Sequence, residues 1–364
     1  MKIAIITFSE YNINYGSCLQ AYSLSEYLKK RGHDVKFIKY REFNDLYEGL
    51  PYSKIFLIKF KTLIYKIVEY PQKKLRKKIE KEFQIFREQK LPHTRLYTSD
   101  EELCNELEEF DCYICGSDQI WNVECLGGIR KPYFLNFAPD LKMKIAYAPS
   151  LGEYEFEKKD YDILKDMLDR FDKISVREAG SIENVQQFTS KKVEWVLDPV
   201  FLNDKEFWEE FSGKEPIIQG DYGVSYFVTH TELGKNVIRK VRDKYGMPVY
   251  NLSLNTLKVS GTSNKYIAKS PQEFVNLIKN AKFVVGTSFH LLAFATIFGI
   301  PSIVIKNGNN QNRLGSILRL INMEENLISN MEDLERTLDT LFTKKIVYEK
   351  LEEKIEKSKQ FLQI

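Results

Sequence analysis

The sequence contains no long uninterrupted hydrophobic run. None of its 364 residues lies in a stretch that approaches the ~18 to 20 apolar residues a membrane-spanning helix needs. The first eight residues are largely apolar, but they lack the long apolar core and the small-residue cleavage site of a signal peptide. We therefore expect a cytoplasmic protein.

Cysteine is scarce. The chain has 5 cysteines, an odd number and too few to form a disulfide framework in a chain of this length. Cys112 and Cys115 form a lone C-x-x-C, which can be a redox pair or half of a zinc site. No second C-x-x-C and no nearby histidine pair completes a metal site. We interpret the two as free thiols in and beside a buried strand, and we expect no metal.

Neither sign of charge dominates the whole chain. Lys+Arg 54 against Asp+Glu 51 gives a net charge of +3, with 43% hydrophobic and 29% charged residues. This composition is that of an ordinary globular protein and excludes a disordered chain, a collagen and a coiled-coil rod. At about 150 residues per domain, the length predicts about two domains.

Positive charge gathers in one segment, residues 54–90. It holds twelve Lys/Arg against four Glu, a net of +8, which leaves −5 for the rest of the chain. Apolar residues that include Phe56 and Phe60 recur at helical spacing there, as in a helix that lies on a membrane surface. This leaves open a peripheral membrane contact through residues 54–78. The alternative is a solvated helical insertion whose apolar stripe packs on its own domain. No nucleic-acid motif accompanies the charge, so we expect no nucleic-acid partner.

Short apolar runs and helical segments alternate along the chain, which is typical of parallel sheets. The predicted strands are 2–8, 35–40, 111–116, 144–148, 173–176, 193–197, 222–228, 248–254, 283–285 and 302–305. Predicted helices include one through 21–28, 161–171, 233–245, one that opens at 270–273, 289–298, 313–320, 333–341 and 345–362. The pattern is interrupted near 203–219. We therefore predict an α/β fold of two Rossmann-like domains that face across a cleft, residues 1–205 with the insertion 54–90 and residues 206–364, with closing helices that cross back.

Ligands of parallel sheets bind beyond the carboxyl ends of the strands, and three loops of this chain fit that position. The first, 11–17, is not a dinucleotide fingerprint, and its glycine either admits a substrate to the backbone or starts a helix. The second, 115–122, holds an aspartate that could take a proton from a hydroxyl, two amides suited to sugar hydroxyls and a tryptophan suited to stacking on a pyranose ring. The alternative is a polar turn with a core tryptophan.

The third loop, 285–291, places His290 in the first turn of an apolar helix. A helix N-terminus disfavours a protonated imidazole, so a histidine there often faces an anion. The alternative is a cap histidine bonded to the backbone. We interpret the remaining histidines, His33, His93 and His230, as surface residues.

Two arginines extend this candidate anion site. Arg177 ends a predicted strand, and Arg313 opens the helix that follows a polar loop beginning at Lys306. Guanidinium groups bind carboxylate or phosphate through two parallel hydrogen bonds, while surface salt bridging is the alternative. No H-x-x-x-H, clustered His/Asp or P-loop is present, so we expect neither a metal nor an ATP site.

Five short segments resemble a known family in order and spacing. They are Asn14-Tyr-Gly-Ser-Cys-Leu-Gln-Ala-Tyr22, Gly116-Ser-Asp-Gln-Ile-Trp-Asn122, Ile174-Ser-Val-Arg-Glu178, Leu197-Asp-Pro199 and Ser288-Phe-His290. From about residue 3 to 325 the chain is similar to the polysaccharide pyruvyl transferase family.

The resemblance implies a GT-B-like pair of domains, with the acceptor side on the first and the donor side on the second. It also implies transfer of a pyruvyl group from phosphoenolpyruvate to two sugar hydroxyls, with formation of a cyclic ketal and release of phosphate. No cofactor beyond the phosphoenolpyruvate donor is expected. The expected acceptor is a lipid-diphosphate-linked glycan at the membrane face.

On this reading His290 binds phosphate and delivers a proton, Arg177 binds the substrate carboxylate, and Asp118 is a base or sugar ligand. The predicted substrate-binding residues are Asn14, Tyr15, Gly16, Ser117, Gln119, Trp121, Asn122, Gly286, Thr287, Ser288, Lys306 and Arg313. Two other classes remain open: a nucleotide-sugar-dependent GT-B glycosyltransferase, and a non-catalytic glycan-binding protein.

Overall fold

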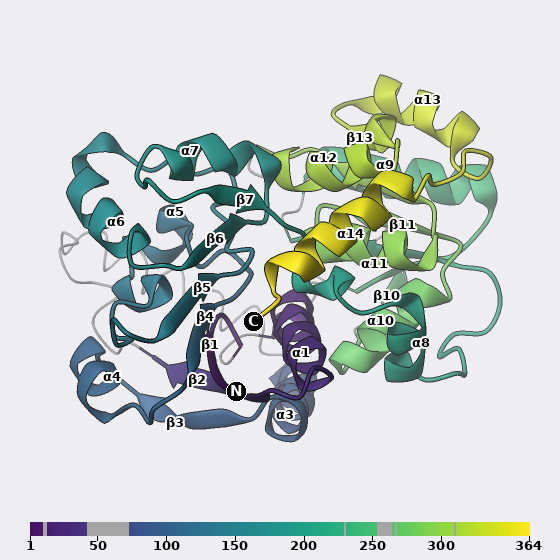
Figure 1. The fold of residues 1–364 in the computed structure, drawn as a ribbon. Helices are drawn as coiled ribbons and strands as arrows, with labels where there is room; N and C mark the ends of the chain where they lie inside the picture. The colour runs from purple at the N-terminus through teal and green to yellow at the C-terminus, as the bar shows by residue number, and fades with distance from the viewer. Residues whose placement is uncertain (10–12, 42–72, 229–230, 253–263, 266–267, 309–310) are drawn as a thin grey trace, which may run out of the picture.

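The computed structural model describes residues 1–9, 13–41, 73–228, 231–252, 264–265, 268–308 and 311–364 (Figure 1). Phe56, Phe60 and His230, which the sequence analysis singled out, lie outside these residues. Within the described part of the chain, no helix is both long and apolar enough to cross a membrane.

The chain builds two parallel sheets flanked by helices, and this confirms the predicted α/β class with two Rossmann-like units (Figure 1). The first sheet has the order β3-β2-β1-β4-β5-β6-β7 and the second β10-β9-β8-β11-β12-β13. Central strands such as β4 and β11 are buried along their whole length, which explains their continuous apolar runs.

The strands of the first sheet are β1 (Lys2–Ile6), β2 (Asp34–Tyr40), β3 (His93–Tyr97), β4 (Cys112–Cys115), β5 (Met143–Ala146), β6 (Lys173–Val176) and β7 (Val193–Trp195). Those of the second are β8 (Gly223–Tyr226), β9 (Val249–Asn251), β10 (Asn264–Lys265), β11 (Phe283–Gly286), β12 (Ser302–Ile305) and β13 (Leu327–Ile328).

The α-helices of the described residues are α1 (Tyr15–Lys29), α3 (Lys73–Lys90), α4 (Asp100–Glu106), α5 (Val123–Leu126), α6 (Tyr161–Leu168), α7 (Ile182–Gln186), α8 (Lys205–Ser212), α9 (Glu232–Tyr245), α10 (Pro271–Lys279), α11 (Phe289–Phe298), α12 (Gln311–Leu320), α13 (Met331–Thr340) and α14 (Glu349–Phe361). The predicted bounds of the strand at 302–305 and the helix at 289–298 match β12 and α11. Strand β3 and helix α4 were not predicted.

Helix α3 forms the last part of the basic segment, and it packs its apolar side on the protein. Phe83 contacts Tyr15 with ring centroids 5.2 Å apart, and Phe86 contacts Phe211 at 6.1 Å. The apolar stripe predicted over residues 56–67 lies outside the described residues, so its packing stays a prediction.

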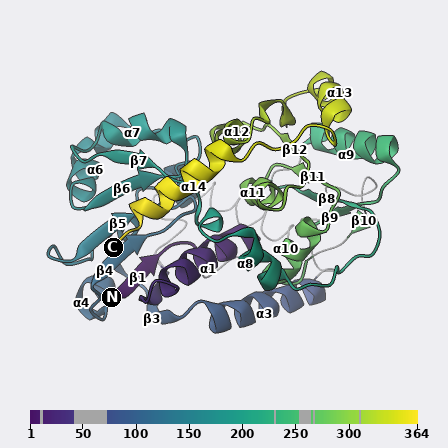
Figure 2. The same ribbon diagram turned by 45° about the vertical axis from the view of Figure 1, so that its right-hand side comes forward.

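Two helices join the units. Helix α1 of the first unit stacks Tyr15 on Phe274 of α10, with ring centroids 4.5 Å apart, and the Tyr15 hydroxyl donates to the Ala268 carbonyl at 2.5 Å. Helix α14 runs back from the second unit across the first (Figure 2). There the Leu197 amide donates to Ser358 Oγ at 2.9 Å, and Lys173 Nζ donates to the Phe361 carbonyl at 3.1 Å.

Candidate active site

A buried carboxylate, Asp198, gathers side chains from both units. Its Oδ2 atom accepts from Ser117 Oγ at 2.9 Å and from Arg177 Nη1 at 3.0 Å, and it lies 3.6 Å from His290 Nε2. Its Oδ1 atom accepts from the Val200 amide at 3.1 Å. Because β4, β6, β7 and β11 all end here, the carboxyl ends of the two sheets supply this cluster.

The charge state of Asp198 follows from these partners. Burial by itself raises the pKa of a carboxyl group, but the neighbouring His290 and Arg177 outweigh that effect and hold the pKa of Asp198 at about 2. The carboxylate is therefore ionised at neutral pH.

His290 of the second unit lies between two residues of the first unit, Asp198 and Gly16. It is the second residue of α11, whose N-cap Ser288 accepts from the Leu291 amide at 3.4 Å. On its other side the ring touches Gly16, where a Cβ atom would lie 2.0 Å from His290 Nδ1. The imidazole is mostly buried, and it lies between the Asp198 carboxylate and the start of α1.

Arg177 does not have the role that the sequence analysis gave it. Its Nε atom donates to Glu178 Oε1 at 3.0 Å, Nη1 donates to Asp198, and the guanidinium lies 4.6 Å from the centroid of the Phe289 ring. The side chain is 1% exposed. The guanidinium already contacts two carboxylates and an aromatic ring. Arg177 therefore positions Asp198 and does not bind a substrate carboxylate.

Asp118 is strained and has one vacant acceptor. Its φ of 78° lies in the left-handed region, which is costly for a residue other than glycine and is found mostly at functional sites. Oδ1 accepts from the Gln119 amide at 2.9 Å, while the buried Oδ2 has no hydrogen-bond partner among the described residues. That oxygen is therefore a buried acceptor whose hydrogen bond is not satisfied among the described residues.

The rest of the 115–122 loop supports Asp118. Trp121 is 1% exposed, stacks on Phe134 with centroids 4.9 Å apart, and donates Nε1–H to the Tyr133 carbonyl. The expectation of a sugar-stacking tryptophan is wrong, because both faces of its ring belong to the core. Asn122 caps α5 and donates to Gln119 Oε1 at 2.9 Å, so these two amides brace the loop.

Most other predicted binding residues also have structural partners. Tyr15 is fully buried between the units and cannot reach a substrate. Asn14 is the N-cap of α1, Thr287 Oγ1 accepts from the Val228 amide at 3.1 Å, and Ser117 bonds Asp198. Gly286 is required by packing, since a Cβ there would lie 2.1 Å from the Tyr226 carbonyl oxygen.

The two remaining cations lie in the second unit. Lys306 follows β12 and is exposed. Arg313 lies in the first turn of α12, and burial together with the nearby Arg177 lowers its pKa, while Glu178, Asp118 and Glu153 act in the opposite direction. Arg313 is thus within electrostatic reach of Arg177, Glu178 and Asp118.

Sequence reasoning missed Asp198 and Glu178. Asp198 stood in the quoted Leu197-Asp-Pro199 segment, and its place directly after a predicted strand was the available signal. Glu178 is fully buried, and its Oε1 accepts from Ser150 Oγ at 2.7 Å as well as from Arg177.

The C-x-x-C pair lies in the core. Cys112 and Cys115 both belong to β4, and burial raises the pKa of Cys112 to about 12. Among the described residues, no group of three or more His, Cys, Asp or Glu side chains is placed to hold a metal ion.

The fold defines the class of this protein as GT-B-like, with two parallel α/β units and with Asp198, Arg177 and His290 gathered between them. The family model for polysaccharide pyruvyl transferase matches residues 14–309. The chain belongs to this family, whose activity is pyruvyl transfer to a glycan.

Solved structures share the fold at low sequence identity. The UDP-GlcNAc 2-epimerase of Methanocaldococcus jannaschii, in complex with UDP-GlcNAc and UDP, is 14% identical with a TM-score of 0.53, over 95% of this chain and 94% of that chain. The enzyme of Neisseria meningitidis bound to UDP-GlcNAc is 13% identical with a TM-score of 0.54, over 98% and 94%. That of Rickettsia bellii is 10% identical with a TM-score of 0.56, over 100% and 96%. No curated protein sequence matches the chain.

Proposed function

We propose that the protein transfers a pyruvyl group from phosphoenolpyruvate to two hydroxyls of one sugar in a cell-surface glycan precursor, with formation of a cyclic ketal and release of phosphate. Family membership supports pyruvyl transfer to a glycan. The observation that carries the mechanism is the pairing of His290 with the ionised Asp198 at the N-terminus of α11.

The first chemical requirement is an acid. The methylene carbon of phosphoenolpyruvate must gain a proton before its C2 can be attacked, and a protonated histidine positioned by a carboxylate suits this task. His290 delivers the proton, and C2 acquires oxocarbenium character. Asp198 stabilises the imidazolium and fixes its ring, with Arg177 and Ser117 holding the carboxylate in place.

The second requirement is a base for the attacking hydroxyl. Asp118 Oδ2, buried and without a partner among the described residues, accepts the proton of the first sugar hydroxyl as its oxygen bonds to C2. The second hydroxyl then displaces phosphate from C2. The two sugar hydroxyls release two protons. One restores the proton that His290 transferred to the methyl group, and the other leaves with the phosphate.

The third requirement is compensation for the negative charge of the donor. Arg177 is already neutralised by Glu178 and Asp198, so the donor carboxylate and phosphate are bound by Arg313, Lys306 and the N-terminus of α11. Three carboxylates, Asp118, Glu178 and Asp198, stand close to the arginines. A protonated His290 therefore adds the charge that makes the site receptive to an anion.

The acceptor we propose is a glycan linked to a lipid diphosphate. An enzyme with such an acceptor works at a membrane face, where the basic segment would contact anionic lipid. In α3 the exposed cations that support this include Arg76, Lys77 and Lys78.

The test is incubation with phosphoenolpyruvate and a panel of lipid-linked and nucleotide-linked glycans, with phosphate release and product mass as readouts. We expect phosphate and a ketal-bearing glycan from the wild type, and a loss of turnover of ~100-fold or more in His290→Ala. Release of a nucleotide from a sugar nucleotide would make the protein a glycosyltransferase. Binding of a glycan without consumption of phosphoenolpyruvate would make it a glycan-binding protein.

A further inference from the structure

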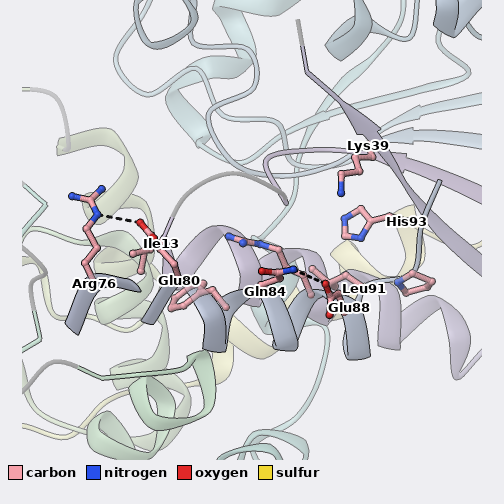
Figure 3. A pocket seen from close by; sticks show the side chains of 11 residues that line it. Ile13, Lys39, Arg76, Glu80, Gln84, Glu88, Leu91 and His93 are labelled. Carbon is pink, nitrogen blue, oxygen red and sulfur yellow. Dashed lines mark hydrogen bonds and ion pairs between the residues drawn. The ribbon is translucent and has the colours of Figure 1, made fainter. Parts of the chain in front are cut away.

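Helices α3 and α14 both pack on the first unit (Figure 2). Helix α3 lines a polar pocket of about 560 Å³ together with residues of β2 and β3, which include Lys39 and His93 (Figure 3). Among the described residues, no partner of Asp198 lines this pocket. Helix α14, in contrast, contacts the chain directly before Asp198.

The backbone of Leu197, the residue before Asp198, is held by two buried side chains. Its amide donates to Ser358 Oγ of α14 at 2.9 Å, and its carbonyl accepts from the Tyr147 hydroxyl at 3.0 Å. Ser358 and Tyr147 are both fully buried. Because a buried backbone donor or acceptor without a partner is costly, these two bonds fix the backbone at Leu197.

The Ser358 hydroxyl is itself oriented by α14. It donates its proton to the Lys354 carbonyl, one turn earlier in the helix, at 2.7 Å. A lone pair of Ser358 Oγ is therefore left for the Leu197 amide. Helix α14 thus presents a fixed acceptor to the first unit.

The same helix supports Arg177, the cation that holds Asp198. The Arg177 carbonyl accepts from Trp195 Nε1 at 3.1 Å, and Lys354 Nζ lies 4.1 Å from the centroid of the Trp195 ring. An ammonium group at this distance is attracted to the face of an indole. Lys354 and Ser358 share one face of α14, because residues four positions apart in a helix are neighbours. This face therefore supports the chain next to both Arg177 and Asp198.

The two ends of α14 are fixed to different units. At its start the hydroxyl of the N-cap residue Tyr348 donates to the Thr296 carbonyl at 3.0 Å, and Thr296 belongs to α11, the helix that carries His290. At its end Lys173 Nζ of the first unit donates to the Phe361 and Gln363 carbonyls at 3.1 and 2.8 Å. The helix therefore spans from the element that bears His290 to the backbone that bears Asp198.

We propose that α14 sets the separation between Asp198 and His290, with Ser358 and Tyr348 as its two positioning residues. The inference deepens the proposed function, on which it rests for what the pair does in the reaction. It adds that two hydroxyl groups outside the Asp198 cluster align the proton donor.

The first test examines the pair without turnover. The full chain is prepared with isotope-labelled histidine, and the ring nitrogens of His290 are followed by NMR, with His290→Gln for their assignment. Asp198→Asn is expected to shift these resonances, because it removes the carboxylate beside Nε2. Ser358→Ala and Tyr348→Phe are expected to shift them in the same direction by a smaller amount.

Matched controls lose equivalent groups elsewhere. Ser25→Ala in α1 removes a fully buried serine hydroxyl whose oxygen has no hydrogen-bond partner among the described residues. Tyr245→Phe in α9 removes a tyrosine hydroxyl that donates to the Leu338 carbonyl of α13 at 2.7 Å, a bond between two helices of the second unit. We expect both controls to keep the wild-type resonances of His290.

The second test measures steady-state kinetics and depends on the proposed function. Ser358→Ala is expected to lower kcat about tenfold or more, because the proton donor and its carboxylate are no longer aligned. Its KM for phosphoenolpyruvate should stay at the wild-type value, since Arg313, Lys306 and the N-terminus of α11 are proposed to bind the donor. Thermal unfolding of every variant establishes that folded protein is compared. A loss of stability alone would not change kcat while leaving KM unaltered.

The inference is wrong if either folded variant, Ser358→Ala or Tyr348→Phe, keeps the wild-type His290 resonances, or if the controls shift them as much. Helix α14 would then stabilise the fold without positioning the pair. If Ser358→Ala does not fold, Tyr348→Phe decides alone. A wild type that does not consume phosphoenolpyruvate would contradict the proposed function instead, and shifted His290 resonances in the two variants would still support positioning by α14.

Discussion

Gly16 of the first unit and His290 of the second are in direct contact, so close that a Cβ atom on residue 16 would lie 2.0 Å from His290 Nδ1. Gly16 is the second residue of α1, and His290 is the second residue of α11. Asp198 Oδ2 lies 3.6 Å from Nε2, so the imidazole has a close neighbour on both sides. The centre is therefore complete only where the two units meet.

Gly16→Ala should displace the imidazole. We expect kcat/KM with phosphoenolpyruvate to fall by ~100-fold or more, because the proton donor would no longer be aligned. The matched control is Gly315→Ala in α12, where the nearest atom to a Cβ is the flexible end of Arg319 at 3.4 Å. Steady-state phosphate release compares the two, and equal activity in both variants would remove the contact from the mechanism.

Substitution of Arg177 should lower the stability of the fold, whereas substitution of Arg313 should weaken the binding of phosphoenolpyruvate. Arg177→Ala leaves the buried Glu178 and Asp198 without their cation, a change that typically costs about 3 to 5 kcal/mol of unfolding free energy. Arg313→Gln should instead raise KM for phosphoenolpyruvate about tenfold or more with little change in stability. We would measure denaturant unfolding and steady-state kinetics of both variants to separate the two effects. Arg177→Lys is the conservative control. An unchanged stability of Arg177→Ala would contradict its positioning role.

Asp198 should contribute to stability in a pH-dependent way. Its pKa of about 2 in the folded protein lies below the ordinary value of 3.8, so its ionised form stabilises the fold. The contribution is fully present above about pH 4 to 5 and is lost as the pH falls toward 2. The difference in unfolding free energy between the wild type and Asp198→Asn should therefore narrow over this window. A difference that stays constant from pH 6 to pH 3 would show that the carboxylate is not paired as described.

The basic helix should bind anionic membranes. Each Lys or Arg near such a surface contributes roughly 1 kcal/mol, and salt screens the attraction. Co-sedimentation should need vesicles with anionic lipid, weaken with salt, and fall when Lys73, Lys74, Arg76, Lys77 and Lys78 become Gln. If the wild-type protein does not co-sediment with anionic vesicles at low salt, the prediction is wrong and the basic segment serves only in packing.

The fold could be predicted because strong local signals agree with it. The capping box at Ser270 and Glu273 and the glycine at 299 fixed the ends of two helices, and buried parallel strands appear as apolar runs. Strand β3 was missed because His93-Thr-Arg-Leu-Tyr97 is a short edge strand with polar residues and no such run.

The site could be predicted only in part. Which loops follow strands is visible in the sequence, and this located Asp118, Arg177 and His290. Which partners each side chain finds depends on contacts between residues far apart in the chain. Arg177 was assigned to a substrate because its bond to Asp198, 21 positions away, cannot be seen in the sequence. Trp121 was assigned to a sugar because nothing local shows that Phe134 stacks on it.

The central claim is that His290 protonates the methylene carbon of phosphoenolpyruvate during ketal formation. It is tested most directly by running the reaction in D2O with a glycan acceptor and determining the isotope content of the product by mass spectrometry. The account predicts one deuterium in the methyl group of each ketal, and loss of ketal formation in His290→Gln. A ketal methyl group without deuterium, or a His290→Gln variant as active as the wild type, would contradict it.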